Sequence, residues 1–202
     1  MLDGVLRKLI DPPLNKMGIL LAKVGISANA ITLFGVLIGL AAAFAIAANW
    51  FLFALILIII SRLADGLDGA VARATKKTDF GGYLDIVMDF LFYAAIPLGF
   101  IFANPSSNAF AGAILLLSFN FNGASFLGYA ILAEKHKHKT DVSGEKSIYF
   151  NNGLIGGSET IVFFIVICIW PKLFAMLSLI FAILVIVTAV MRILYAREVF
   201  KE

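Results

Sequence analysis

Four aspartates draw attention because they lie within strongly apolar segments of the chain. Asp65 and Asp68 are three residues apart, and Asp85 and Asp89 are four residues apart, so each pair lies on one face of a helix. Clustered carboxylate oxygens suit hard cations such as Mg²⁺ and Mn²⁺, which in turn bind phosphate groups. The spacing therefore indicates a divalent-metal site acting on a phosphate-bearing substrate.

The cost of placing these acids in apolar helices supports the metal interpretation. An aspartate at the centre of a membrane helix costs roughly 2.5–3.5 kcal/mol on insertion scales, and the nearby Arg62 and Arg73 cannot neutralise four of them. Two other interpretations stay open at this point. The acids could form salt bridges around a polar seam, or they could line a cation or proton pathway, as in transporters.

Six apolar segments must position these residues. Each has about the 20 residues needed to cross about 30 Å of hydrocarbon, the fifth being short, and the expected spans are about 29–48, 50–72, 82–103, 108–133, 154–170 and 172–195. Residues 1–17 are expected to form an amphipathic interfacial helix whose pattern ends at Pro12 and Pro13. We therefore predict an all-α integral membrane protein with a single domain, 1–202.

Composition excludes several classes of protein. Of the 202 residues, 61% are apolar and 14% charged, against about 45–50% and about 25% in soluble proteins. This excludes a disordered chain, a nucleic-acid-binding tail and an ordinary cytosolic domain. The single cysteine, Cys168, allows no internal disulfide.

The distribution of lysine and arginine predicts the orientation. Basic residues precede the first span, follow the sixth, and occupy the loops between spans two and three and between spans four and five. The three loops on the opposite side contain only one basic residue, Lys172. By the positive-inside rule, both termini are cytoplasmic, and the membrane is the cytoplasmic membrane if the source is prokaryotic. The short basic loop also makes the second and third spans antiparallel neighbours, which brings the two acidic faces together.

The segment from Asp65 to Asp89 closely resembles the signature of the CDP-alcohol phosphatidyltransferase family. The matching pattern is Asp65-x2-Asp68-Gly69-x2-Ala72-Arg73-x7-Gly81-x3-Asp85-x3-Asp89. Seven residues separate Arg73 from Gly81, where the family usually has eight. The stretch from Ser27 to Thr32 also resembles the family's entry to the first span.

The resemblance implies a six-helix membrane enzyme that transfers a phosphatidyl group from CDP-diacylglycerol to an alcohol and releases CMP. It implies two divalent ions, Mg²⁺ or Mn²⁺, held by Asp65, Asp68 and Asp85, with Asp89 completing the second metal site and acting as general base. The CDP part of the donor would be bound by five motif residues: Asp68, Gly69, Ala72, Arg73 and Gly81.

The acceptor alcohol is not indicated by any motif. Candidate acceptor-binding residues near the cytoplasmic ends of spans four to six are Lys146, Glu159 and Arg192. Lys146 and Arg192 could instead be interfacial anchors, and Glu159 could pair with Arg192. A CDP-aminoalcohol donor with diacylglycerol as acceptor is the alternative enzyme, and a cation or proton transporter is the alternative outside enzymes. The expected partners are the two substrates and membrane lipids, with no nucleic acid, and the chain could form a homodimer.

Overall fold

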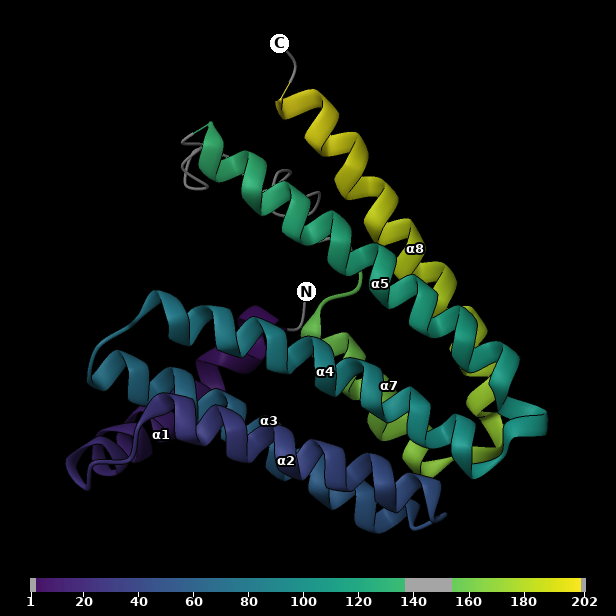
Figure 1. The fold of residues 1–202 in the computed structure, drawn as a ribbon, viewed down its shortest axis with the longest axis horizontal. Helices are drawn as coiled ribbons and strands as arrows, with labels where there is room; N and C mark the ends of the chain where they lie inside the picture. Colours follow the sequence, from purple (N-terminus) through teal and green to yellow (C-terminus); the bar gives the residue numbers. More distant parts are fainter. Residues whose placement is uncertain (1–2, 137–153, 201–202) are drawn as a thin grey trace.

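A computed structural model of the chain describes residues 3–136 and 154–200, and every regular element within them is a helix (Figure 1). The predicted all-α class is therefore confirmed. In chain order the elements are α1 (Asp3–Lys23), α2 (Ala28–Ala47), α3 (Phe51–Ala74), α4 (Asp79–Ala103), α5 (Pro105–Lys135), α7 (Gly157–Ile169), the short 3₁₀ helix η2 (Pro171–Leu173) and α8 (Phe174–Val199).

Each predicted span coincides with one of these helices. Four segments in the described part of the chain are long and apolar enough to cross a membrane: α2, α4, α5 and Pro171–Val199, which combines η2 with α8. α3 has 24 residues but carries four charged residues between its middle and its C-terminal end, Arg62, Asp65, Asp68 and Arg73, and α7 has only 13 residues. Length and composition alone thus support four of the six expected spans.

α1 differs from the prediction that its pattern ends at Pro12 and Pro13. The helix continues through both prolines to Lys23, although proline lacks the N–H group that a helix interior normally uses. Packing against α3 accounts for the continuation. A Cβ atom added at Gly18 would lie 2.7 Å from Ala70 Cβ, and one added at Gly66 would lie 2.7 Å from Leu14 Cδ1. This contact spans two helices and is not visible in the local sequence.

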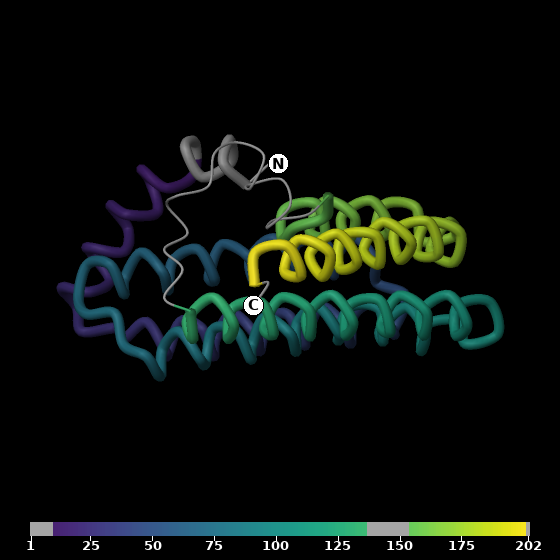
Figure 2. Tube along the Cα trace, turned by 90° about the horizontal axis from the view of Figure 1, so that it is seen from above, coloured from purple at the N-terminus to yellow at the C-terminus, as the bar shows by residue number. Residues whose placement is uncertain are grey.

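The helices pack in two groups. α2 lies against both α3 and α4, while α5 pairs with α8, and α4 contacts α5. Figures 1 and 2 both show α5 and α8 side by side along the bundle. α7 packs on α3, so the group that carries the aspartates also contacts the C-terminal half of the chain.

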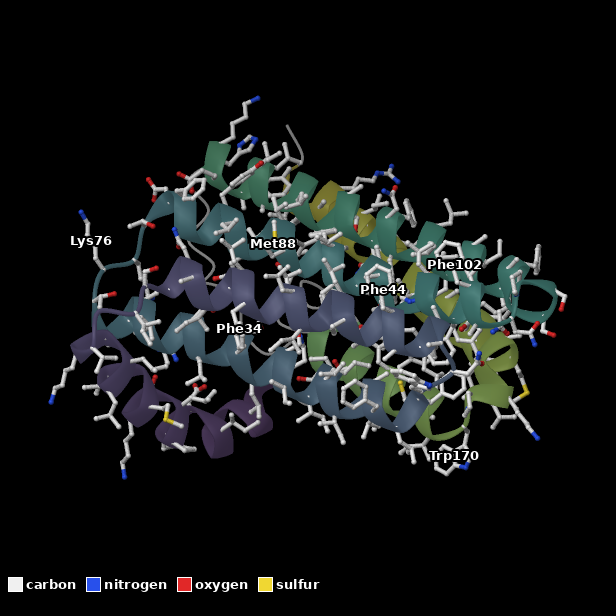
Figure 3. All side chains as sticks on the ribbon, turned by 60° about the horizontal axis from the view of Figure 1, so that its bottom comes forward. Phe34, Phe44, Lys76, Met88, Phe102 and Trp170 are labelled. Carbon is white, nitrogen blue, oxygen red and sulfur yellow. The ribbon has the colours of Figure 1, made fainter. Side chains whose placement is uncertain are left out.

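The outer surface of the bundle is apolar. Phe44, Leu52, Phe102 and Phe110 are each between 67% and 74% exposed, and large apolar side chains of this kind are exposed on most of the helices. Such extended apolar exposure suits a surface covered by lipid. Lys76, in the α3–α4 connection, and Trp170, which follows α7, lie toward opposite ends of the bundle (Figure 3).

Gly99 makes the tightest backbone contact between α4 and α2, and this contact yields a stability prediction. A Cβ atom at Gly99 would lie 2.6 Å from the Ala43 carbonyl oxygen, a backbone atom that cannot rotate away. We expect Gly99→Ala to destabilise the fold by about 1–3 kcal/mol and to lower the thermal unfolding midpoint in detergent. Gly128→Ala is the matched control, because no atom lies within 4 Å of its added Cβ. Equal losses in the two variants would contradict the prediction.

Candidate functional site

Three of the four predicted aspartates come together. One carboxylate oxygen from each of Asp65, Asp68 and Asp85 lies within 4.8 Å of the other two. Two oxygens bound on opposite sides of one Mg²⁺ lie about 4.2 Å apart, so small side-chain rotations would let all three bind a single ion. The all-oxygen, triply charged donor set fits a hard divalent cation. We call this group the three-carboxylate cluster.

A short connection without helical structure, residues 75–78, places the two acidic faces opposite each other. α3 ends at Ala74, and α4 begins at Asp79 behind an N-cap in which Thr78 Oγ1 accepts a hydrogen bond from Gly81 N at 3.0 Å. The N-cap satisfies a backbone donor that would otherwise have no partner and so starts α4 immediately. The connection makes α3 and α4 antiparallel (Figure 1). The prediction that they are packed neighbours is wrong, because both helices pack mainly on α2 and meet through side chains such as Arg62 and Asp89.

Asp68 is the most buried member of the cluster and is held by α2. Asp68 is only 5% exposed, and Thr32 Oγ1 of α2 donates a hydrogen bond to Asp68 Oδ2 at 2.5 Å. Thr32 was not among the predicted site residues. Its position in the stretch that resembles the family's entry to the first span is the signal that could have identified it.

Asp89 lies outside the three-carboxylate cluster and pairs with Arg62. Arg62 Nη1 donates to Asp89 Oδ1 at 2.7 Å and lies 3.5 Å from Asp65 Oδ1. The guanidinium carbon lies 3.8 Å from the centroid of the Phe92 ring, a cation–π contact. The sequence prediction gave Arg62 no site role, although an arginine one turn before Asp65 in an apolar helix is a recognisable signal.

A small cleft opens beside Asp89. It is lined by Thr32, Gly35 and Val36 of α2, Arg62 and Asp65 of α3, and Met88 and Asp89 of α4. Met88, on α4, is labelled in Figure 3. The cleft joins a carboxylate outside the cluster to one inside it, so a ligand there could contact both.

The two motif glycines, Gly69 and Gly81, lie beside polar side chains, and the N-terminal helices α1 and α2 contribute Asn15 and Asn29 to this region. Arg73 donates from Nε and Nη2 to Asn15 Oδ1 at 3.2 and 2.8 Å. A Cβ atom at Gly69 would lie 3.2 Å from Arg73 Nη1, and one at Gly81 would lie 3.2 Å from Asn29 Oδ1. Ala72 lies one residue before Arg73 on the exposed end of α3. The contact from Asn15 was not predicted, because it joins residues 58 positions apart.

The acceptor candidates have helix-stabilising contacts in this structure. Arg192 is 4% exposed, and its Nη1 donates to Asn122 Oδ1 at 2.9 Å and to Ser125 Oγ at 2.7 Å, which joins α8 to α5. Glu159 Oε2 accepts from Gly156 N at 3.0 Å at the start of α7. Lys146 lies outside the described residues.

Comparisons with known proteins agree with the motif. A family model described as CDP-alcohol phosphatidyltransferase matches residues 25–197. The inner membrane protein YnjF of Escherichia coli strain K12 is 45% identical over 193 residues, covering 96% of this chain and 94% of that protein. An archaetidylinositol phosphate synthase of Pyrococcus horikoshii is 39% identical over 95 residues, covering 46% of this chain and 50% of that protein.

A solved structure shares the fold. The phosphatidylinositol phosphate synthase PgsA1 of Mycobacterium tuberculosis, crystallised with CDP-DAG bound, superposes with a TM-score of 0.73 over 91% of this chain and 93% of that chain. The sequence identity is 19%, so this comparison concerns the arrangement of the helices.

Proposed function

The chain belongs to the CDP-alcohol phosphatidyltransferase family, and from this premise we propose that it transfers a phosphatidyl group from CDP-diacylglycerol to an alcohol and releases CMP. It is an integral membrane transferase of phospholipid biosynthesis. The main structural support for the proposal is the three-carboxylate cluster with Asp89 beside it. CDP-DAG in the PgsA1 structure supports the choice of donor.

The three-carboxylate cluster is proposed to hold a divalent ion, Mg²⁺ or Mn²⁺, and Asp89 with Asp65 to hold a second ion in the catalytic complex. Such ions would neutralise the diphosphate and stabilise the charge that develops on the leaving CMP. Burial of Asp68 and its hydrogen bond from Thr32 support this role, because they fix one carboxylate before any ligand arrives.

Asp89 is proposed as the general base. It borders the cleft and lies outside the cluster, so an acceptor hydroxyl can approach it. Asp89 takes the proton of that hydroxyl, and the alcohol oxygen forms a bond to the phosphorus that carries diacylglycerol. The bond from that phosphorus to the bridging oxygen breaks, and the electron pair leaves with CMP.

The CDP moiety is proposed to bind at the exposed end of α3 and the start of α4, through Asp68, Gly69, Ala72, Arg73 and Gly81. Asn15 orients Arg73 through two hydrogen bonds. We expect Asn15→Leu to raise the KM for the donor about fivefold, equivalent to about 1 kcal/mol, with kcat unchanged. Asn15→Asp keeps an acceptor oxygen for both hydrogen bonds and is the control in steady-state assays. An unchanged KM in Asn15→Leu would contradict this role.

The membrane arrangement is proposed as six spans, α2, α3, α4, α5, α7 and α8, in one domain of residues 1–202. α1 would lie in the interface, which is supported by its exposed Met17, Ile19 and Leu20. Both termini would be cytoplasmic, as would the end that carries Lys76. Asp68 of α3 is buried and the side chain of Arg62 is 11% exposed, so charged groups of α3 point into the bundle, which supports a span that its mean hydropathy alone would not identify.

The acceptor is proposed to bind between the cleft and the cytoplasmic ends of α5, α7 and α8, where Lys146, Glu159 and Arg192 are the candidate contacts. Arg192 and its partners Asn122 and Ser125 would suit an anionic or hydroxyl-rich acceptor. A homodimer is compatible with this arrangement, since the cleft is formed by α2, α3 and α4 of one chain.

Product analysis tests the proposed function. Purified protein is incubated with CDP-diacylglycerol, Mg²⁺ or Mn²⁺ and a panel of alcohols, and CMP and the lipid product are identified. We expect CMP release that depends on both metal and acceptor. Turnover only with a CDP-aminoalcohol and diacylglycerol would favour the alternative enzyme. Gradient-driven ion flux in vesicles, without nucleotide turnover, would favour a transporter and contradict the proposal.

A further inference from the structure

Arg62 occupies the space that a second metal ion would need. A cation shared by Asp65 and Asp89 must lie between their carboxylate oxygens. Arg62 Nη1 already lies there, 2.7 Å from Asp89 Oδ1 and 3.5 Å from Asp65 Oδ1. The guanidinium and a second ion therefore compete for one position.

The surrounding helices hold Arg62 in this position. Its side chain is 11% exposed, its guanidinium lies over the Phe92 ring, and its Nη2 lies 3.4 Å from Ser61 Oγ. Phe92 is fully buried, and Gly39 provides the space for it, because a Cβ there would lie 2.5 Å from Phe92 Cδ2. Displacing the guanidinium would leave a buried positive charge separated from its carboxylate partner, which is strongly unfavourable.

Electrostatics makes the two parts of the site unequal. The three-carboxylate cluster has three negative charges close together and no guanidinium in ion-pair distance of Asp68 or Asp85 among the described residues, so a first divalent ion relieves repulsion. A second ion would meet the first ion and Arg62, both positive, and would have to break the ion pair with Asp89. The diphosphate of a donor supplies further oxygen ligands and negative charge, which offset that repulsion.

We propose that Arg62 acts as a fixed cation in the donor-free protein, so that the resting site binds one divalent ion and takes up a second only with the donor. This inference rests on the proposed function, because it uses the same aspartates. It assigns Arg62 as a positioning residue, which holds the Asp89 side chain beside the cleft until the donor binds.

Manganese stoichiometry tests the inference without any measurement of turnover. Mn²⁺ binding to the purified protein in detergent is measured by electron paramagnetic resonance and calorimetry, with and without CDP-diacylglycerol. We expect one Mn²⁺ per unchanged chain without donor and two with donor. Arg62→Gln is expected to bind two without donor, whereas Arg62→Lys keeps the charge and is expected to bind one. Arg197→Gln, at the far end of α8, is the matched control and is expected to bind one.

The possible results separate this inference from the proposed function. Two Mn²⁺ in the unchanged, donor-free protein, or one in a folded Arg62→Gln variant, would overturn the role of Arg62. One Mn²⁺ in the presence of donor would overturn the donor-dependent step. No Mn²⁺ in the unchanged protein would contradict the metal centre itself, and with it the proposed function. The titration of the unchanged protein is informative even if Arg62→Gln fails to fold, which its thermal unfolding curve would reveal.

Discussion

Asp89→Asn is expected to abolish turnover while the protein keeps most of its affinity for CDP-diacylglycerol. The amide cannot accept the proton of the acceptor hydroxyl, and loss of a general base typically lowers the rate about 10²–10⁴-fold. The three-carboxylate cluster and Arg73 remain in this variant, so the donor keeps its main contacts. CMP release measures the rate, and equilibrium binding of labelled CDP-diacylglycerol measures the affinity.

Folding of Asp89→Asn can be separated from its chemistry. The asparagine Oδ1 can still accept the hydrogen bond that Arg62 Nη1 donates to Asp89 at 2.7 Å, which limits the cost of losing the charge. Thermal unfolding in detergent checks that the variant is folded. Asp79→Asn is the matched control, because Asp79 lies in the exposed first turn of α4 and is expected to leave turnover intact. Near-normal turnover in Asp89→Asn would exclude Asp89 as the base.

Asp85→Asn is expected to eliminate metal binding, donor binding and turnover together. Asp85 is the only α4 residue in the three-carboxylate cluster, so its replacement leaves a first ion with ligands from one helix alone. Replacing residues that hydrogen-bond to a metal ligand already lowers metal affinity about 10–100-fold. We expect loss of the ligand itself to lower metal affinity at least about 100-fold. Mn²⁺ titration followed by donor binding measures both losses.

Although Asp85→Asn is expected to lose metal binding and activity, we do not expect it to lose stability. Three carboxylates with oxygens within 4.8 Å of one another repel each other without metal, so removing one charge should leave the metal-free unfolding midpoint unchanged or higher. A lower midpoint would mean that lost activity reflects misfolding. Retained metal affinity in a folded variant would place the ion elsewhere. The Asp79→Asn control applies here too.

The acidic faces could be predicted because they follow from periodicity within single helices. A spacing of three or four residues puts Asp65 with Asp68, and Asp85 with Asp89, whatever the rest of the fold does. The short connection after Ala74 then makes α3 and α4 antiparallel, although it does not show that α2 packs against both. These local features were sufficient to identify the metal-binding candidates and the all-α class.

Helix ends and long-range contacts were harder to predict. α1 continues past Pro12 and Pro13 because its later turns pack on α3. The two prolines in the sequence do not indicate that contact. The hydrogen bonds from Arg73 to Asn15 and from Arg62 to Asp89 join residues 58 and 27 positions apart. Periodicity does not determine the axial offset or rotation of one helix against another.

The sequence by itself determined the helices, the apolar surface and which aspartates share a face, because side-chain direction repeats every 3.6 residues along a helix. Only the tertiary structure decided how the four acids are divided. Close packing at Gly35 against Ala64 sets how α2 meets α3. The resulting geometry gathers Asp65, Asp68 and Asp85 and leaves Asp89 to Arg62, since an ion pair requires a particular distance between helices, not a particular spacing along one.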